Sequence, residues 1–218
     1  MKIWLHTNRF ELLLMALMMV IFNKIFFFEP SFYSSWIWPF NMVLLGSVSM
    51  GVFRENSKVI RLLKNVLFLG VIAVPLFADF FFQHHPATVI ALSIYVLFYL
   101  ILFVELMRQI VQRSEVTESV IYGSLSGFLL LIITSAFSFL LIDLAEAGSF
   151  NNIKGTTIPE KYHQIIYFSS VTISTIGYGD ITPAKDNARL LSAFWGVVGQ
   201  FYMVAVVGII ISKYSSKT

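Results

Sequence analysis

The sequence contains no cysteine and little charge. Of its 218 residues only 12% are Asp, Glu, Lys or Arg, whereas 57% are hydrophobic. The absence of cysteine excludes disulfide bonds, thiolate metal ligands and redox chemistry through sulfur. The low charge excludes an ordinary soluble domain, in which about a quarter of the residues are charged. A chain with a mean hydropathy of +0.79 belongs in a lipid bilayer.

The net charge of +3 comes from few basic residues. A basic chain can bind nucleic acid, but here the Lys and Arg residues flank apolar runs, as they do in membrane proteins. We therefore expect no nucleic-acid partner. Because the sequence has no metal-ligand cluster, nucleophile–base pair or phosphate-binding loop, we also expect no enzymatic activity and no cofactor.

Six apolar stretches are long enough to cross a bilayer as helices, for which about 20 residues are needed. The expected fold is therefore an all-α membrane protein. The six spans are Phe10–Phe28, Trp36–Phe53, Leu62–Phe82, Ala87–Met107, Ser119–Ile142 and Leu190–Ser212. Most Lys and Arg residues fall on one side of this arrangement, so we expect both termini in the cytoplasm and the protein in the plasma membrane.

A polar segment, Arg108–Glu118, divides the chain. We expect residues 1–107 to form a peripheral helical unit of four spans. Residues 108–118 then form a linker at the cytoplasmic membrane surface, and residues 119–218 form a second membrane unit.

A shorter helical stretch lies between the last two spans. Ile158–Val171 cannot cross the membrane, has Pro159 in its first turn, and precedes the polar, glycine-containing run Thr172–Asp180. Irregular backbone is tolerated at membrane depth only where protein buries it or where it lines water. The arrangement therefore predicts a re-entrant segment that lines a pore.

Residues 175–179 read T-I-G-Y-G and resemble the T-V-G-Y-G filter loop of tetrameric potassium channels. The resemblance covers Ser119–Ser212. It implies a pore domain at residues 119–218 and a homotetramer, in which rings of backbone carbonyls replace the hydration shell of potassium. The potassium ligands would be Thr175, Ile176, Gly177 and Tyr178, and Gly179 would complete the filter. Gly177 and Gly179 permit the positive φ values that turn successive carbonyls to one side.

Four residues would support the filter in such a channel, namely Tyr167, Val171, Thr172 and Asp180. Some family members carry an acidic residue at the position of Val171, so that Asp180 lacks this carboxylate partner here. We expect Tyr167 to hydrogen-bond Asp180 instead.

The last span contains three glycines that interrupt an apolar helix. Gly199 falls at the position of the family's gating hinge, and we expect it to act as one. Gly196 and Gly208 fit a hinge and close helix packing equally well.

Four spans before a pore unit resemble voltage-gated channels, whose fourth helix carries Arg or Lys at every third position. Ala87–Met107 contains neither. The nearest pattern, formed by Lys58, Arg61 and Lys64, lies at the cytoplasmic mouth of the third span, where the positive-inside rule explains it. We therefore expect only weak voltage dependence.

Other polar residues in the first four spans have simpler explanations. Lys24 and Asp79 both lie near the outer side and are expected to snorkel or to pair. His84 and His85 lie in an outer loop, where solvation is the expected role, rather than pH sensing.

Two alternatives to a passively conducting channel subunit remain open. One is the pore-like subunit of a potassium-uptake transporter, although such systems usually carry several filter loops per chain and this chain carries one. The other is a non-conducting regulatory membrane subunit. The expected partners are further copies of the chain and membrane lipids.

Overall fold

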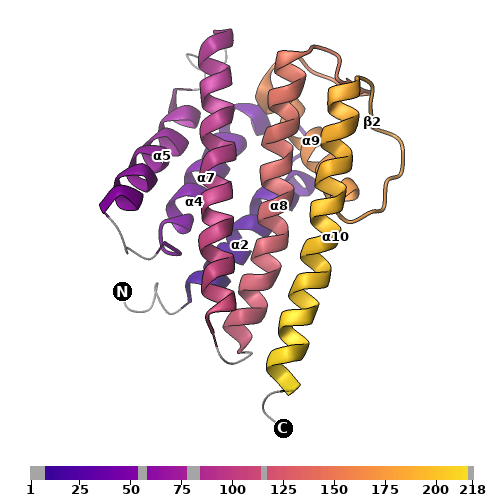
Figure 1. The fold of residues 1–218 in the computed structure, drawn as a ribbon. Coiled ribbons are helices and arrows are strands. Elements are labelled where there is room, and N and C mark those ends of the chain that lie inside the picture. Colours follow the sequence, from indigo (N-terminus) through magenta and orange to yellow (C-terminus); the bar gives the residue numbers. More distant parts are fainter. Residues whose placement is uncertain (1–7, 54–57, 78–83, 114–116, 216–218) are drawn as a thin grey trace.

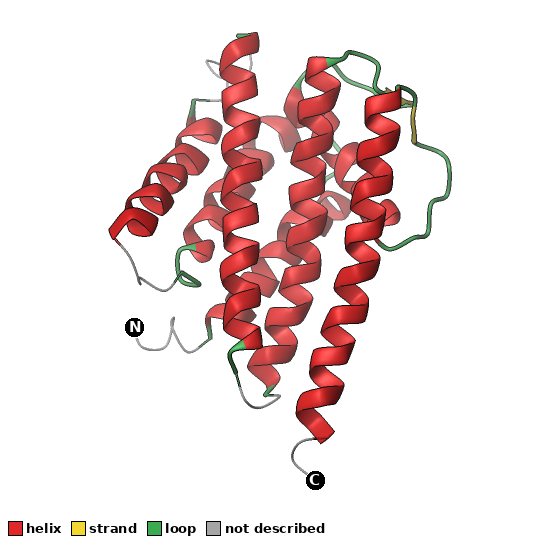
Figure 2. Cartoon of the chain, in the orientation of Figure 1, coloured by secondary structure: helices red, strands yellow, loops and turns green. Residues whose placement is uncertain are grey.

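The computed structural model describes residues 8–53, 58–77, 84–113 and 117–215, which are almost entirely helical (Figure 1, Figure 2). The first part of the chain consists of α2 (Arg9–Phe22), the 3₁₀ turn η1 (Asn23–Phe26), α3 (Pro30–Phe32), the π-helical turn η2 (Tyr33–Ile37), α4 (Trp38–Ser49), α5 (Lys58–Leu76) and α7 (His85–Val111). The second part consists of α8 (Glu118–Ala145), β1 (Phe150–Asn151), α9 (Ile158–Ile173), β2 (Thr182–Pro183) and α10 (Asp186–Ser215).

Three of the described helices are long and apolar enough to cross a membrane, namely α7, α8 and the Asp186–Val206 part of α10. They match the fourth, fifth and sixth predicted spans. Together with the near absence of strands in the described part of the chain, they confirm an all-α membrane protein.

The first three predicted spans are less regular. α2 ends at Phe22, because the next residue, Asn23, enters a 3₁₀ turn and pairs its side chain with Asn41 on α4. The second span is helical without a break from Pro30 to Ser49, and the third has its apolar part at Lys64–Leu76. The count of six spans therefore stays a prediction.

The helix α8 lies at the centre of the fold, between α7 and α10 (Figure 1). It also contacts α2 and α9. Its side chains from Leu129 to Phe137 are all buried, as expected for a helix that is apolar on every side. Gly127 of α8 leaves room for Tyr202 of α10, because a Cβ on Gly127 would collide with the Tyr202 hydroxyl. The core thus joins both halves of the chain.

The helices that precede α8 pack in succession: α2 contacts α4, α4 contacts α5, and α5 contacts α7. Polar side chains in this part of the chain find partners among the same helices and turns. Asn23 and Asn41 are buried and joined by two hydrogen bonds of 2.8 and 3.2 Å. The ammonium of Lys24 donates to the carbonyl of Phe27 and lies 5.1 Å from the ring centroid of Tyr33. Asp79, the partner expected for Lys24, lies outside the described residues.

The predicted linker is shorter in the structure, because α7 continues through Arg108 to Val111. The reason is a buried side chain. Gln109 accepts a hydrogen bond from Arg9 of α2 at 3.2 Å and donates to the carbonyl of Val52 at 2.7 Å. Of the residues between α7 and α8, the structure describes 112, 113 and 117.

Candidate ion-conduction site

The short helix α9 begins at Ile158, as the sequence predicts, and ends at Ile173 rather than at Val171. A capping box fixes its start. The Glu160 carboxylate accepts the backbone N–H groups of Thr156 at 2.9 Å and Thr157 at 3.2 Å. These hydrogen bonds lower the pKa of Glu160, since they favour its ionised form.

Two polar contacts that the sequence did not reveal hold α9 in position. The Lys161 ammonium lies 2.7 Å from the carboxylate of Asp143, a buried residue at the end of α8 that also accepts the N–H of Ser149. The side chain of Gln164 bonds both the N–H and the carbonyl of Lys154, at 2.9 and 2.6 Å. The helix α9 is therefore tied to α8 and to the loop that precedes α9.

We expect Lys161→Met to lower the free energy of unfolding by about 2 kcal/mol, because it leaves the buried Asp143 carboxylate without its counter-ion. The exposed pair of Lys185 and Glu146, at 3.9 Å, supplies a matched control, and Lys185→Met should change stability by less than about 0.5 kcal/mol. Thermal unfolding of the purified protein in detergent measures both. Equal effects of the two variants would contradict the structural role of Lys161.

The predicted filter segment leaves the end of α9 through a tight turn. The N–H groups of Ile176 and Gly177 both donate to the carbonyl of Val171, at 2.9 and 3.1 Å, and Thr175 donates to Thr172 at 3.1 Å. Every second residue then has a positive φ: 60° at Thr175, 55° at Gly177 and 81° at Gly179. A positive φ is strained for a β-branched residue such as Thr, and strain of this kind is typical of functional sites.

Two filter side chains stay exposed within one chain, namely Ile176 at 54% and Tyr178 at 72%. The sequence resemblance predicts that they pack behind the filter. In a single chain they lack this cover, so any such packing requires further copies of the chain.

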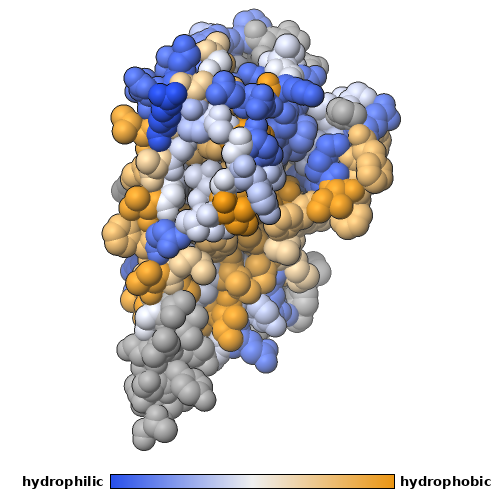
Figure 3. Space-filling model, turned by 90° about the vertical axis from the view of Figure 1, so that its right-hand side faces the viewer, coloured by the Kyte–Doolittle hydropathy of each residue, from blue (hydrophilic) through white to orange (hydrophobic). Residues whose placement is uncertain are grey.

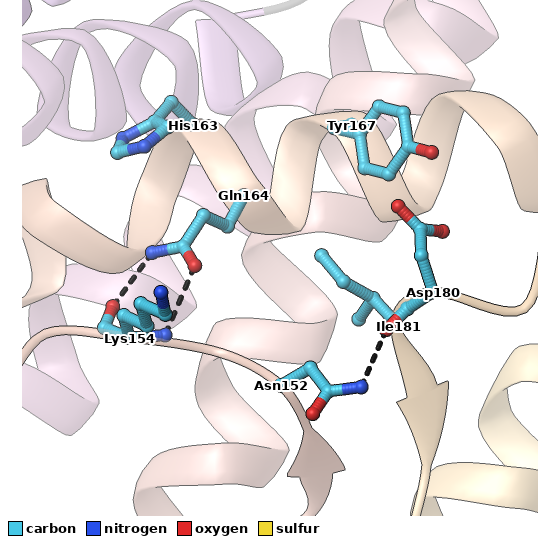
Figure 4. A pocket seen from close by; sticks show the side chains of 7 residues that line it. All are labelled: Asn152, Lys154, His163, Gln164, Tyr167, Asp180 and Ile181. Carbon is cyan, nitrogen blue, oxygen red and sulfur yellow. Dashed lines mark hydrogen bonds between the residues drawn. The ribbon is translucent and has the colours of Figure 1, made fainter.

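The outer end of the filter is joined to the loop before α9. There β1 and β2 pair antiparallel, with Phe150 opposite Pro183, and the Asn152 side chain donates to the carbonyl of Asp180 at 2.7 Å. In Figure 4 the Tyr167 hydroxyl points toward the Asp180 carboxylate. Asp180, as a hydrogen-bond acceptor and a negative charge, raises the pKa of Tyr167. Strands of two residues carry no readable periodicity, so the sequence did not predict this sheet.

Gly199 makes a close contact with the end of the pore helix. A Cβ at this position would lie 2.8 Å from both the carbonyl oxygen and the Cγ2 of Ile173. At Gly196 and Gly208, by contrast, it would meet no atom within 4 Å among the described residues. α10 runs as one helix through Gly199. The hinge stays a prediction, and close approach is a second reason for glycine here.

Aromatic side chains of η2 and α4 contact α9 directly. Tyr162 of α9 packs edge-on against Trp38 of α4, with ring centroids 6.1 Å apart, and His163 packs in the same way against Tyr33 of η2 at 6.3 Å. Tyr162 and Trp38 are fully buried, whereas His163 is half-buried. The helices near the start of the chain therefore support α9, the helix that precedes the predicted filter.

We expect the protein to lose stability in mild acid through His163. Burial and the nearby charge of Lys24 lower the pKa of its imidazole. The native state then takes up this proton less readily than the unfolded chain, so the stabilisation is complete above about pH 6.5 and is lost as the pH falls through the native pKa.

Thermal unfolding of the wild type and of His163→Gln at about pH 7.5 and about pH 5 tests this prediction. The acid-induced drop should be smaller in the variant. An identical drop in both proteins would assign the pH dependence to other groups.

Comparison with known proteins bears on the second half of the chain. A family model described as "Ion channel" matches residues 127–216. Two relatives from Oryza sativa subsp. japonica are named two pore potassium channel c, 41% identical over 76 residues, and two pore potassium channel b, 48% identical over 48 residues. A relative from Rhodopseudomonas palustris, whose name also refers to a potassium channel, is 32% identical over 75 residues. No solved structure matches the chain significantly.

These similarities are local. They cover 31%, 22% and 33% of this chain and 16%, 13% and 18% of the three relatives, respectively. The matched family segment includes most of α8, the pore helix α9, the T-I-G-Y-G loop and α10. Residues 127–216 therefore resemble an ion channel domain, and the three relatives with local similarity carry potassium channel names.

Proposed function

We propose that the chain is a subunit of a potassium-selective channel that conducts passively through a pore formed by four copies. The alternating positive φ values at Thr175, Gly177 and Gly179 carry this proposal. They turn successive carbonyl groups toward one side, as a ring of potassium ligands requires. The bound potassium ions are the transported substrate, and no other cofactor is proposed.

The negative end of the α9 dipole supports the same function. The helix ends at Ile173, directly before the filter, so its partial negative charge favours a cation at the inner end of the loop. The end of α9 rests against Gly199, and this contact holds the filter entrance at a fixed position along α10.

Assembly into a homotetramer is supported by exposed apolar side chains. Besides Ile176 and Tyr178, α10 exposes Leu190, Phe194, Val197, Phe201 and Val204. Figure 3 shows the α10 side with hydrophobic residues below a hydrophilic upper end. Contact with neighbouring subunits and with lipid buries such residues. We also propose that both termini lie in the cytoplasm and that the protein lies in the plasma membrane.

Ion flux from liposomes tests the proposed function. Vesicles that contain the purified protein should release potassium down its gradient, retain sodium and be blocked by barium, and native mass spectrometry should show tetramers. Rapid passive flux separates a channel from a transporter, whose flux is slower and coupled. Absence of flux from tetrameric protein would favour a non-conducting subunit.

We expect the channel to respond weakly to voltage. Steep gating needs 3–4 charges per subunit that cross the field, each contributing about 2.3 kcal/mol per 100 mV. The helix α7 contains the fourth predicted span, and its single Lys or Arg is Arg108, which lies in the last turn of the helix just beyond that span. Limiting-slope analysis of open probability measures the gating charge. A value above roughly 8 elementary charges per tetramer would contradict the prediction.

A further inference from the structure

The outer end of the predicted filter is held from two sides at Asp180. Its carbonyl oxygen accepts a hydrogen bond of 2.7 Å from the side-chain amide of Asn152, and the Tyr167 hydroxyl points toward its carboxylate (Figure 4). Both neighbours line the same open cleft of about 550 Å³ beside α9. Asn152 precedes Asp180 by 28 positions, so this hydrogen bond joins the loop between α8 and α9 to the residue that follows the T-I-G-Y-G run.

The residue type at position 152 suits this contact. The backbone of Asn152 is left-handed, with φ +65°. Asn adopts this region more readily than most residues that have a Cβ, and its side chain carries an N–H donor. Asp also tolerates the conformation but has no donor when it is ionised, and Gly tolerates it but has no side chain. Asn therefore meets both requirements, one of the backbone and one of the hydrogen bond.

The loop that carries this donor is fixed to the rest of the fold. Phe150 is buried and packs edge-on against Phe139 of α8 and Phe168 of α9, with ring centroids 5.5 and 5.2 Å apart. The carbonyl of the buried Ser149 accepts the N–H of Ala184 at 2.8 Å. The donor at position 152 therefore has a fixed position relative to α8 and α9.

We propose that Asn152 is a positioning residue of the filter, whose amide holds the Asp180 carbonyl and thereby keeps the outermost potassium ligands turned toward the pore axis. This role rests on the proposed function, because only a conducting tetramer has ions at these ligands. Gly179 has no Cβ to restrict its backbone, so a fixed Asp180 limits its rotation. Without the hydrogen bond, the outer end of the filter can turn into a non-conducting arrangement that binds potassium poorly. External potassium then opposes this change, because a ligand stabilises the state that binds it.

Single-channel recording of the full chain in planar bilayers, at low and high external potassium, tests this role with two variants. In about 1 mM external potassium, Asn152→Gly should lower the ratio of open to closed occupancy about fivefold, the effect of one lost hydrogen bond. Raising external potassium to about 100 mM should restore the ratio of the wild type. Asn152→Asp keeps the size and the backbone preference of Asn but removes the donor, so it should show the same loss and the same recovery.

Asn151→Ala is the matched control, since the neighbouring Asn151 is also exposed but donates to the hydroxyl of Thr182, at 3.1 Å. It should leave the potassium dependence unaltered. Wild-type potassium dependence in both Asn152 variants would overturn the positioning role and leave the channel function standing. A loss in only one of the two variants, or an equal loss in Asn151→Ala, would assign the effect to the loop in general and overturn the role too. A wild-type chain without current would overturn the proposed function, and the role of Asn152 with it.

Discussion

Replacing Gly177 or Gly179 by Ala is expected to abolish potassium-selective current while the protein still folds. Both residues have φ values, +55° and +81°, that an L-residue adopts only at a cost of about 1–2 kcal/mol. A Cβ at either position meets no described atom within 4 Å, so the loss arises from the backbone and not from a clash in the subunit. Once these residues turn away from positive φ, their carbonyls leave the proposed ring of potassium ligands. Unitary currents of each variant in planar bilayers measure the effect.

Gly148 supplies the matched control for these variants. It lies in the outer loop with φ +76°, and an added Cβ there also meets nothing within 4 Å of the described chain. Gly148→Ala therefore imposes similar backbone strain away from the filter, and it should preserve selective current. Normal selectivity in Gly177→Ala would show that this loop is not the filter, whereas loss of current in Gly148→Ala would point to a general effect of strain.

Gly199→Ala is expected to destabilise the pore domain by about 1–3 kcal/mol and to remove most of the current. Alanine favours a helix over glycine by about 1 kcal/mol, so helix propensity alone predicts stabilisation. The collision with Ile173 reverses the sign, because the nearest atoms include a backbone carbonyl that cannot rotate away. Thermal unfolding in detergent and macroscopic current should both fall.

The control for this variant is Gly208→Ala in the same helix, where an added Cβ has no described neighbour within 4 Å. It should gain stability from helix propensity. Gly199→Ala could instead be as stable as Gly208→Ala and alter only channel opening. That result would show that glycine is needed at position 199 for the predicted hinge and not for close packing against Ile173.

The sequence was sufficient to predict the local features of the site. Pro159 indicates where α9 begins, and positive φ at Gly177 and Gly179 follows from the T-I-G-Y-G pattern. Each of these features depends on residues only a few positions apart. Such short-range chemistry can be read without knowledge of the tertiary fold.

Features that depend on distant residues were not predictable. The pair of Asp143 and Lys161 and the contact of Gly199 with Ile173 arise only when α8, α9 and α10 are packed together. Gln109 was assigned to a polar linker because its charged neighbours dominate the local pattern, yet its burial extends α7. A single sequence gives the polarity of such residues, but it does not give their partners.

The reversal potential of unitary currents in mixed potassium and sodium solutions is the most direct test of the central claim. With the purified chain in a planar bilayer, the reversal potential should follow the potassium gradient and stay insensitive to the sodium gradient, because in the proposed pore a carbonyl ring formed by Thr175 to Tyr178 replaces the hydration shell of potassium. A reversal potential that responds equally to both gradients would contradict a potassium-selective filter at these residues.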